Sequence, residues 1–240
     1  MKDNLIYGFH VIERLLETRP EQIITLYLSR EAPFIAKAEK AGIKVQIVDK
    51  KRLNEWLPTE NHQGVAAHIH PISLLSMEDL DKILETLSKD PLLLVLDGIQ
   101  DPHNLGAILR SAEIFGVTAI IIPKDRAVSL TATVRKVACG AAELVPVVAV
   151  TNLARCLTEL KTRGIWIVGT AMQAEKTLLE TDLKGPIALV FGAEGTGLRR
   201  LTESECDFLM KIPMVGAIES LNVSVAAGIC LFEALRQRKD

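Results

Sequence analysis

The chain has 240 residues, enough for one large domain or two ordinary ones, and 48% of them are apolar, so a sizeable core can form. A formal net charge of −2 excludes an overall basic surface, and an aromatic content of 4% argues against the stacking platforms of single-strand binders. Any contact with nucleic acid must therefore depend on local patches.

Cysteine usage and the lack of long apolar runs restrict the class further. Four cysteines are scattered without a C-x-x-C pair, which argues against a disulfide framework and against a zinc site. The N-terminal segment carries charges throughout, unlike a signal peptide, and no apolar run approaches the roughly 18 residues of a membrane span. We expect a cytoplasmic protein with reduced thiols, no metal and no membrane contact.

The first 75 residues alternate short helical and strand patterns. In chain order these patterns predict a helix over 8–17, a strand over 24–28, a helix over 33–42, and strands over 44–48 and 64–70. Residues 1–75 are therefore expected to form a small α/β unit. The charged segment 76–91 follows, and Ser76 with Asp79 three residues later is a weak capping box, which predicts a short helix plus a linker.

A second unit is predicted over residues 92–240, where strands rich in Val, Ile and Leu alternate with helices. The strands are expected at 92–96, 118–122, 144–148, 165–170, 187–192 and 207–213, and the helices at 104–116, 131–142, 152–164, 198–205 and 223–238. Near-continuous apolar strands separated by helices predict an α/β fold with a parallel sheet covered on both faces. Such sheets bind ligands at the carboxyl ends of their strands.

The first of these strand ends leads into the loop 97–110. Asn104 is a candidate helix N-cap, Gly106 permits close backbone approach, and Arg110 lies six residues after Asn104, so the two need not share a face. Taken alone, the segment favours a capped helix that carries a surface arginine over a ligand site.

A second strand end, at 190–198, places three glycines around Glu194. The backbone can approach a ligand closely there while one carboxylate projects into the site. The glycine spacing is G-x-x-G-x-G and not the G-x-G-x-x-G of dinucleotide-binding loops, which argues against a NAD site.

The last helix is apolar on nearly every side, which is typical of a buried helix, and only Glu233 is a clear solvent position. Three small polar residues, Ser220, Asn222 and Ser224, stand at its start. Either Ser220 or Asn222 is expected to be the N-cap. Three polar residues in five exceed what one cap requires, and a helix N-terminus also favours ligands.

Together these segments resemble a known family. Asn104-x-Gly106-x₃-Arg110, then LVFGAEGTGL, then IPMVGAIESLNVSVAAGICLFEALRQR are similar to the three ordered motifs of the SpoU/TrmH-type (SPOUT) RNA 2′-O-ribose methyltransferases. The motifs extend over more than half of the chain, from Asn104 to Arg238. The overall length and the YGFHVIERLLE segment at the start resemble members that methylate a guanosine in bacterial large-subunit (23S) rRNA.

The resemblance implies a deep trefoil knot in residues 92–240 and an L30e-like, ribosomal-protein-like RNA-binding domain in residues 1–75. It implies S-adenosylmethionine as cofactor, 23S rRNA or its precursor particle as partner, and a homodimer. The residues that match the family's cofactor-binding positions are Thr170, Gly192, Ile212 and Leu221. Those that match its polar active-site positions are Asn104, Arg110, Glu194, Ser220 and Asn222.

Two roles stay open for Arg110: activation of the ribose hydroxyl, or anchoring of the neighbouring phosphate, in its own subunit or across a dimer. Because an arginine holds its proton with a pKa above about 12, we favour anchoring or stabilisation of the transition state. Glu194 is expected to orient Asn104 or Asn222. The alternative is a structural salt bridge of Glu194 with Arg199 or Arg200.

Basic patches are the candidate contacts with RNA: Lys37, Lys40 and Lys44 in the first unit, and Arg135–Lys136 and Arg199–Arg200 in the second. Charge runs are more often solvated surface. Two alternatives to an rRNA methyltransferase stay open at this point, namely the same chemistry on tRNA and a non-catalytic RNA-binding or ribosome-assembly protein of the same fold.

Overall fold

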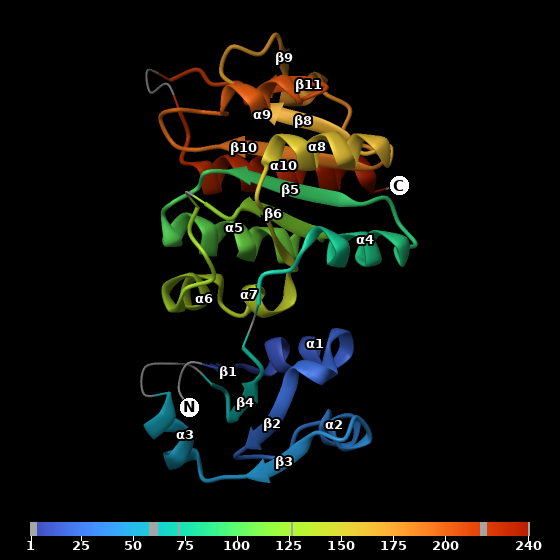
Figure 1. Cartoon of the computed structure of the whole chain (residues 1–240). Coiled ribbons are helices and arrows are strands. Elements are labelled where there is room, and N and C mark those ends of the chain that lie inside the picture. Colours follow the sequence, from blue (N-terminus) through green and yellow to red (C-terminus); the bar gives the residue numbers. More distant parts are fainter. Residues whose placement is uncertain (1–3, 58–61, 72, 126, 217–219, 240) are drawn as a thin grey trace. The chain divides into compact units, whose positions relative to one another are not determined.

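Over the residues that the structure describes, the chain folds around two sheets, one of four strands and one of seven (Figure 1). This computed structural model describes residues 4–57, 62–71, 73–125, 127–216 and 220–239. The chain divides into two compact units, Met1–Ser73 and Leu74–Asp240, each with one of the sheets.

The first unit is a mixed four-stranded sheet with the strand order β1-β4-β2-β3. In this order β2 is parallel to β3 and antiparallel to β4, and β4 is antiparallel to β1. The elements are β1 (Leu5–Tyr7), α1 (Phe9–Thr18), a 3₁₀ turn (Pro20–Gln22), β2 (Ile23–Leu28), α2 (Ile35–Lys40), β3 (Lys44–Ile47), α3 (Lys50–Trp56) and β4 (Val65–Ile69).

All five elements predicted for this unit are present. Besides the 3₁₀ turn, two further elements, β1 and α3, are not evident from the sequence. Strand β1 has three residues, too few for a visible alternation, and α3 buries a single side chain, Leu53, so it has no apolar stripe.

The second unit contains the seven-stranded sheet, which is parallel throughout, with the order β7-β6-β5-β10-β8-β11-β9. Its strands are β5 (Leu92–Asp97), β6 (Ala119–Pro123), β7 (Val147–Val150), β8 (Trp166–Thr170), β9 (Lys176–Thr177), β10 (Ile187–Gly192) and β11 (Phe208–Lys211). Its helices are α4 (Met77–Glu85), α5 (Pro102–Ile114), α6 (Ala132–Ala138), α7 (Ala141–Leu144), α8 (Leu153–Thr162), the 3₁₀ turn Leu178–Glu180, α9 (Arg200–Ser204) and α10 (Val223–Arg238). The predicted parallel sheet is confirmed.

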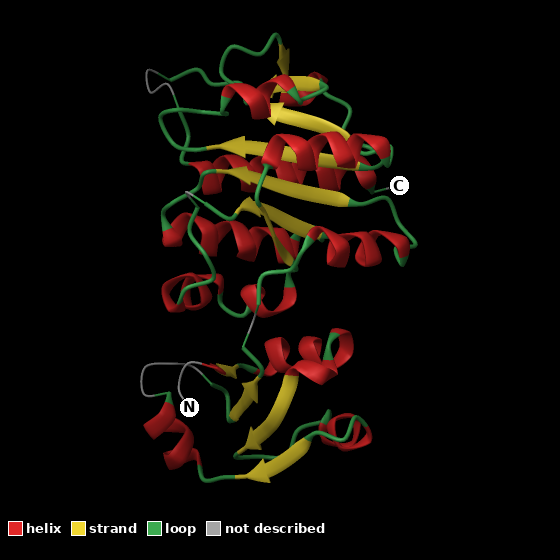
Figure 2. Cartoon of the chain, in the orientation of Figure 1, coloured by secondary structure: helices red, strands yellow, loops and turns green. Residues whose placement is uncertain are grey.

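Helices cover both faces of this sheet, in front of and behind the strands in Figure 2. Because successive side chains of a strand point to opposite faces, β5 contributes Leu94 and Leu96 to one core and Leu93 and Val95 to the other. The first core includes side chains of α5, α6, α7 and α10, and the second includes side chains of α4 and α8. This explains why the strands read as continuous apolar runs.

One predicted helix, 131–142, is interrupted. Cys139 and Gly140 both adopt left-handed backbone conformations, with φ of 51° and 93°, which end α6 and start α7 in a new direction. A left-handed residue that is not glycine is uncommon, so the break at Cys139 is not a position that propensity predicts.

The segment 76–91, expected to be a short helix plus linker, begins with a capped helix. The Asp79 N–H donates to Ser76 Oγ over 3.2 Å, and the Ser76 N–H donates to Asp79 Oδ2 over 3.0 Å, so the predicted capping box is confirmed as helix α4.

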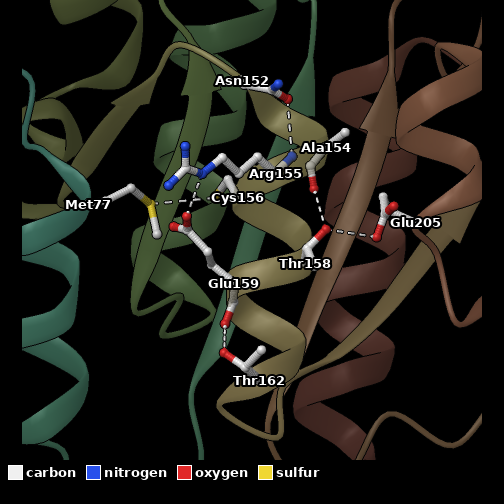
Figure 3. Close-up of polar contacts among 9 residues, drawn as sticks. All are labelled: Met77, Asn152, Ala154, Arg155, Cys156, Thr158, Glu159, Thr162 and Glu205. Atoms are coloured by element: carbon white, nitrogen blue, oxygen red, sulfur yellow. Dashed lines mark hydrogen bonds and ion pairs between the residues drawn. The ribbon is translucent and has the colours of Figure 1, made fainter.

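Helix α4 nevertheless packs into the second unit and does not act as a linker. Leu80 is fully buried in the core shared with α8, and the Cys156 thiol of α8 lies 3.5 Å from Met77 Sδ (Figure 3). The boundary between the units therefore lies before the helix, because its apolar face needs the second sheet's core.

The last helix, α10, is buried on one side only. Ala227, Cys230, Leu231 and Ala234 have no exposed surface and belong to the core. Three exposed residues of the opposite side are apolar, with Val225 49% exposed, Ile229 38% and Phe232 57%, and the exposed Arg236 follows them one turn later. The expectation of a helix buried on nearly every side is therefore wrong for this face.

The expectation that Glu233 faces solvent is also wrong, since this residue is only 6% exposed. Its carboxylate accepts from Arg236 over 2.8 and 2.7 Å and from Gln237 over 2.8 Å. These donors hold the pKa of Glu233 down at about 2, with the Arg236 hydrogen bonds as the largest cause. The buried carboxylate is charged and satisfied.

The four cysteines all lie in the described ranges and are free thiols. Cys139 is exposed, whereas Cys156, Cys206 and Cys230 are at least partly buried. Burial raises the pKa of these three thiols to about 12. Among the described residues, none of the helices combines the length and the apolar character that a membrane span requires.

Candidate active site

Three neighbouring parallel strands, β10, β8 and β11, end at the same edge of the second sheet. Thr170 is the last residue of β8, Gly192 is the last of β10, and Ile212 directly follows β11. The end of β5 joins them, because Asp97 stands opposite Gly192 in the register of the sheet. The structure thus gathers at one edge the strand ends that the sequence indicated.

Three segments far apart in the sequence meet in a closed hydrogen-bond network beside this edge. The Asn104 amide donates to Glu194 Oε1 over 3.0 Å. The Asn222 amide donates to the same oxygen over 2.8 Å and to Asn104 Oδ1 over 2.9 Å. Glu194 contacts both asparagines, as expected from the sequence. Among the described residues the alternative salt bridge with Arg199 or Arg200 does not form, and Arg199 instead pairs with Asp97.

Asn222 explains the polar cluster at the start of α10. Its Oδ1 accepts from the N–H groups of Ser224 and Val225 over 2.9 and 3.4 Å, so it is the N-cap, and its Oδ1 also accepts the Ser224 hydroxyl over 2.5 Å. The amide nitrogen of the same side chain reaches Glu194 and Asn104. One residue therefore caps the helix and connects it to two other loops.

Ser220 does not join the network. It is exposed and makes no hydrogen bond with another described residue. It precedes the N-cap by two residues, and residues 217–219 of the predicted 212–222 loop lie outside the described ranges.

The loop that carries Glu194 folds back on the end of β10. A Cβ atom on Gly192 would lie 2.1–2.4 Å from backbone atoms of Gly197 and Leu198, so only glycine fits there. The Gly197 N–H donates to the Ala193 carbonyl over 2.9 Å and closes the turn. The glycines thus serve a tight loop that aims Glu194 at the asparagines.

Asp97 is a buried carboxylate that sequence reasoning missed. It is 1% exposed, its Oδ2 accepts the Arg199 N–H over 2.9 Å, and the Arg199 guanidinium lies 3.5 Å from Oδ1. Among the described residues Oδ1 has no hydrogen-bond partner. Asp97 fastens the end of the Glu194 loop to β5, and a charged residue that ends an otherwise apolar strand was the signal for it.

Arg110 lies on the exposed side of α5, apart from the network. Its Nη1 is 3.8 Å from the Cys139 sulfur, and no contact with Asn104, Glu194 or Asn222 is present. Asn104, by contrast, is 6% exposed. The two residues of the first motif therefore differ in environment, which their spacing allows, and Arg110 is available to an anionic partner. The expectation that Asn104 caps the helix is wrong, because Asp101 is the N-cap of α5 and accepts from the His103 N–H.

The four residues matched to cofactor positions offer a mixture of surfaces. The Thr170 hydroxyl donates to the Val190 carbonyl over 3.1 Å, so it is already used within the sheet. Gly192 presents main chain only, Ile212 packs partly into the core, and Leu221 is 38% exposed. Main-chain groups and apolar surface are what this edge can offer a ligand.

Several predicted RNA-contact residues are engaged within the protein. Lys37 lies 3.3 Å from Glu17, Arg135 donates to the buried Glu143 over 2.9 Å, and Arg199 pairs with Asp97. The side chains of Lys40, Lys44 and Arg200 are exposed. No group of three or more His, Cys, Asp or Glu side chains suited to a metal ion occurs within the described residues.

Comparison with known proteins matches both units. The family described as SpoU rRNA Methylase matches residues 91–232, and the one described as RNA 2′-O ribose methyltransferase substrate binding matches residues 5–75. A protein of Shewanella oneidensis named 23S rRNA (guanosine-2′-O-)-methyltransferase RlmB is 51% identical over 245 residues, which cover 100% of this chain and 99% of the relative. Its namesake in Pseudomonas aeruginosa is 52% identical, with 97% and 96% covered.

Solved structures agree on the fold. The SpoU methyltransferase AviRb from Streptomyces viridochromogenes, in complex with AdoMet, superposes with a TM-score of 0.74 at 24% identity, with 97% of this chain and 89% of that chain covered. A TrmH/SpoU tRNA modifying enzyme of A. aeolicus has a TM-score of 0.56 at 32% identity, with 67% and 83% covered. The second of these aligns with only part of this chain.

Proposed function

The chain belongs to the SpoU rRNA methylase family, and from that membership we propose that it transfers a methyl group from S-adenosylmethionine to the ribose 2′-hydroxyl of a guanosine in 23S rRNA. One observation carries the substrate: relatives named for this reaction are about half identical over the whole chain, the first unit included. The tRNA modifying enzyme of A. aeolicus covers two thirds of the chain, which favours rRNA over tRNA.

The strand-end edge suits the cofactor chemically. Gly192 and Ile212 offer main-chain groups for its polar atoms, and Ile212 and Leu221 offer apolar surface for an adenine ring. Thr170 completes this set at the end of β8. When bound, S-adenosylmethionine supplies an electrophilic methyl group.

The residues of the chain position the reaction. Asn104, Glu194 and Asn222 hold three loops in one arrangement around the strand ends, and such fixed geometry contributes on the order of 7–11 kcal/mol in favourable cases. Arg110 is exposed, and its planar fork of donors suits it to anchor the phosphate beside the target ribose. Ser220, which is exposed two residues before Asn222, would serve as a further hydroxyl donor.

We propose the family's deep trefoil knot for the second unit and an L30e-like fold for the first. Two features support the knot. In the sheet, β10 lies between β5 and β8, although β8 precedes β10 in the sequence. In addition, Asn222, at the start of the last helix, forms hydrogen bonds with Asn104 and Glu194. The mixed β1-β4-β2-β3 sheet with helices supports the L30e-like fold.

A homodimer is proposed from the apolar exposed face of α10. Val225, Ile229 and Phe232 follow one another at helical spacing, and Ile114 of the adjacent α5 is 63% exposed. The Phe115 and Phe232 rings meet edge to face with centroids 6.3 Å apart, which joins the two helices into one surface. A second copy would cover this surface. Ribosomal RNA or its precursor particle as partner also supports a cytoplasmic location.

Methyl transfer from labelled S-adenosylmethionine to 23S rRNA that lacks the modification tests the function, followed by mapping of the 2′-O-methyl sites. We expect a single methylated guanosine. Methylation of tRNA alone would overturn the substrate, and absence of cofactor binding would overturn the enzyme assignment in favour of a non-catalytic RNA-binding protein. Transfer only to a precursor particle would identify that particle as the substrate.

A further inference from the structure

The first unit contains a cleft of about 750 Å³, within the roughly 300–1,000 Å³ typical of ligand sites. It lies among the start of α1, the end of β2, the helix α3 and the turn before β4, elements that Figure 1 labels. None of the candidate catalytic or cofactor-binding residues of the second unit lines it.

His62 sets the orientation of one side of the cleft. The Gly64 N–H donates to His62 Nδ1 over 3.0 Å, so the imidazole proton resides on Nε2. Nε2 then donates to Asn54 Oδ1 over 2.8 Å. Burial, with the nearby Lys50 charge, lowers the pKa of His62 and keeps the ring neutral in this arrangement. The Asn54 oxygen is thereby used, and its NH₂ group has no hydrogen-bond partner among the described residues.

The side chain of Gln63 is oriented in a similar way. Its Oε1 accepts the Phe9 N–H over 3.0 Å at the start of α1, which leaves its NH₂ group for a ligand. The backbone of Gln63 is left-handed, with φ of 54°, an uncommon conformation for a residue other than glycine. The Ser29 hydroxyl donates to the Gly64 carbonyl over 3.3 Å. The polar groups that could accept a hydrogen bond are thus largely used within the protein.

Two basic side chains, Arg30 and Lys50, also line the cleft. Neither Arg30 nor Lys50 makes an ion pair or hydrogen bond with another described residue, and no carboxylate is among the described lining residues. The stem of Arg30 runs along Gly64, where an added Cβ atom would lie 3.4 Å from Arg30 Cγ. A donor-rich, positively charged cleft selects a ligand rich in acceptors.

An aromatic side chain supplies the remaining surface. The Phe9 ring lines the cleft, is partly exposed, and packs against Phe34 with centroids 4.9 Å apart. Unpaired RNA bases stack on such rings, and their edges carry acceptors that amide NH₂ groups can read.

We propose that this cleft binds one unpaired nucleotide of the RNA substrate. Arg30 and Lys50 hold its phosphate, Phe9 contacts its base, and Asn54 and Gln63 donate to acceptors on the base edge. The inference rests on the proposed function for the identity of the ligand as RNA. It adds to that function a defined recognition site in the first unit.

The test compares two cleft variants with a matched control in the full-length chain. The first is the double variant Arg30→Ala, Lys50→Ala. The second, Asn54→Asp, keeps the acceptor for His62 Nε2 but replaces the free donor with a carboxylate oxygen. The control is Lys51→Ala, which removes a neighbouring exposed charge of α3 that does not line the cleft.

The readouts are the Kd for a 23S rRNA fragment with unpaired nucleotides, its salt dependence, the Kd for S-adenosylmethionine and the melting temperature. We expect each cleft variant to weaken RNA binding by about tenfold or more, and the control by less than about threefold. The double variant should lower the salt slope by about 0.7 for each phosphate group that the cleft no longer neutralises. Cofactor affinity and melting temperature should stay unchanged.

RNA binding by both cleft variants that equals that of Lys51→Ala overturns the proposal. The proposal is also overturned if the cleft variants weaken binding of a fully paired RNA duplex as much as binding of RNA with unpaired nucleotides, because the cleft would then be a general phosphate-binding surface. If the proposed function itself is wrong, the result differs: the protein without substitutions would bind RNA but transfer no methyl group to it.

Discussion

The two sites use similar side chains in opposite ways. At the strand ends of the second unit, the side chains of Asn104, Glu194 and Asn222 form hydrogen bonds with one another, so this cluster holds the loops together. In the cleft of the first unit, Asn54 and Gln63 have their oxygens occupied, while their NH₂ groups have no partner within the described ranges. A closed network fixes geometry, whereas a network closed on one side only prepares a surface for a partner.

The same contrast separates two arginines of the second unit. Arg199 is bound to buried Asp97 and fastens a loop, while Arg110 is exposed and is the arginine that we propose for the substrate. Variants of the closed network should therefore change stability, and variants of the open groups should change activity or affinity alone.

The largest effect is expected for Arg110→Ala. Loss of its interaction with the substrate should lower kcat by roughly 10²–10³-fold, similar to the loss of other transition-state donors. The affinity for S-adenosylmethionine should stay within about twofold of the parent, by calorimetry. Arg155→Ala, which removes a surface arginine paired with Glu159, is the control. A large loss of cofactor binding would contradict the separation of Arg110 from the closed network.

Glu194→Ala should break the closed network and act on stability as well. It leaves the amides of Asn104 and Asn222 without their shared acceptor, which should cost about 1–3 kcal/mol, toward the lower end because Glu194 is exposed. Denaturant unfolding measures the change. Glu194→Gln keeps one acceptor oxygen and should recover part of the loss; equal stability of all three proteins would show that the network is not structural.

A smaller effect tests the exposed apolar face of α10. Phe232→Ser should weaken self-association by at least about tenfold, since a buried Phe side chain contributes about 1.5–3 kcal/mol. Sedimentation at several protein concentrations measures it. Ser substitution of Leu179, which is 71% exposed elsewhere in this unit, is the matched control. A parent protein that is monomeric at all concentrations would refute the dimer.

The smallest effect concerns Glu233, another closed pair. Because its pKa is lowered in the folded chain, its contribution to stability is complete above the unfolded value near 4.5 and is lost as the pH falls toward about 2. With Arg236 well exposed, this amounts to about 1 kcal/mol or less. Glu233→Gln should flatten the decline of unfolding free energy between pH 4.5 and 2; an unchanged pH profile would contradict the pairing.

Much of the fold was predictable because its signals are local. The apolar runs of β5 and β10, the capping box at Ser76 and the polar start of α10 each appear within a few residues of sequence. The break at Cys139, the short β1 and the fate of segment 76–91 were not, since each depends on packing against elements elsewhere in the chain.

For the candidate site, the sequence alone determined which polar residues stand in the predicted strand-end loops: Asn104 and Arg110, Glu194 among glycines, and Asn222 before the last helix. Only the tertiary structure decided their partners. Asn104 meets Glu194 across 90 residues and Asn222 across 118, Asp97 is drawn into the loop, and Glu233 turns inward. Periodicity and capping are local properties of the chain, whereas a hydrogen bond between distant segments exists only once the sheet has brought its strand ends together.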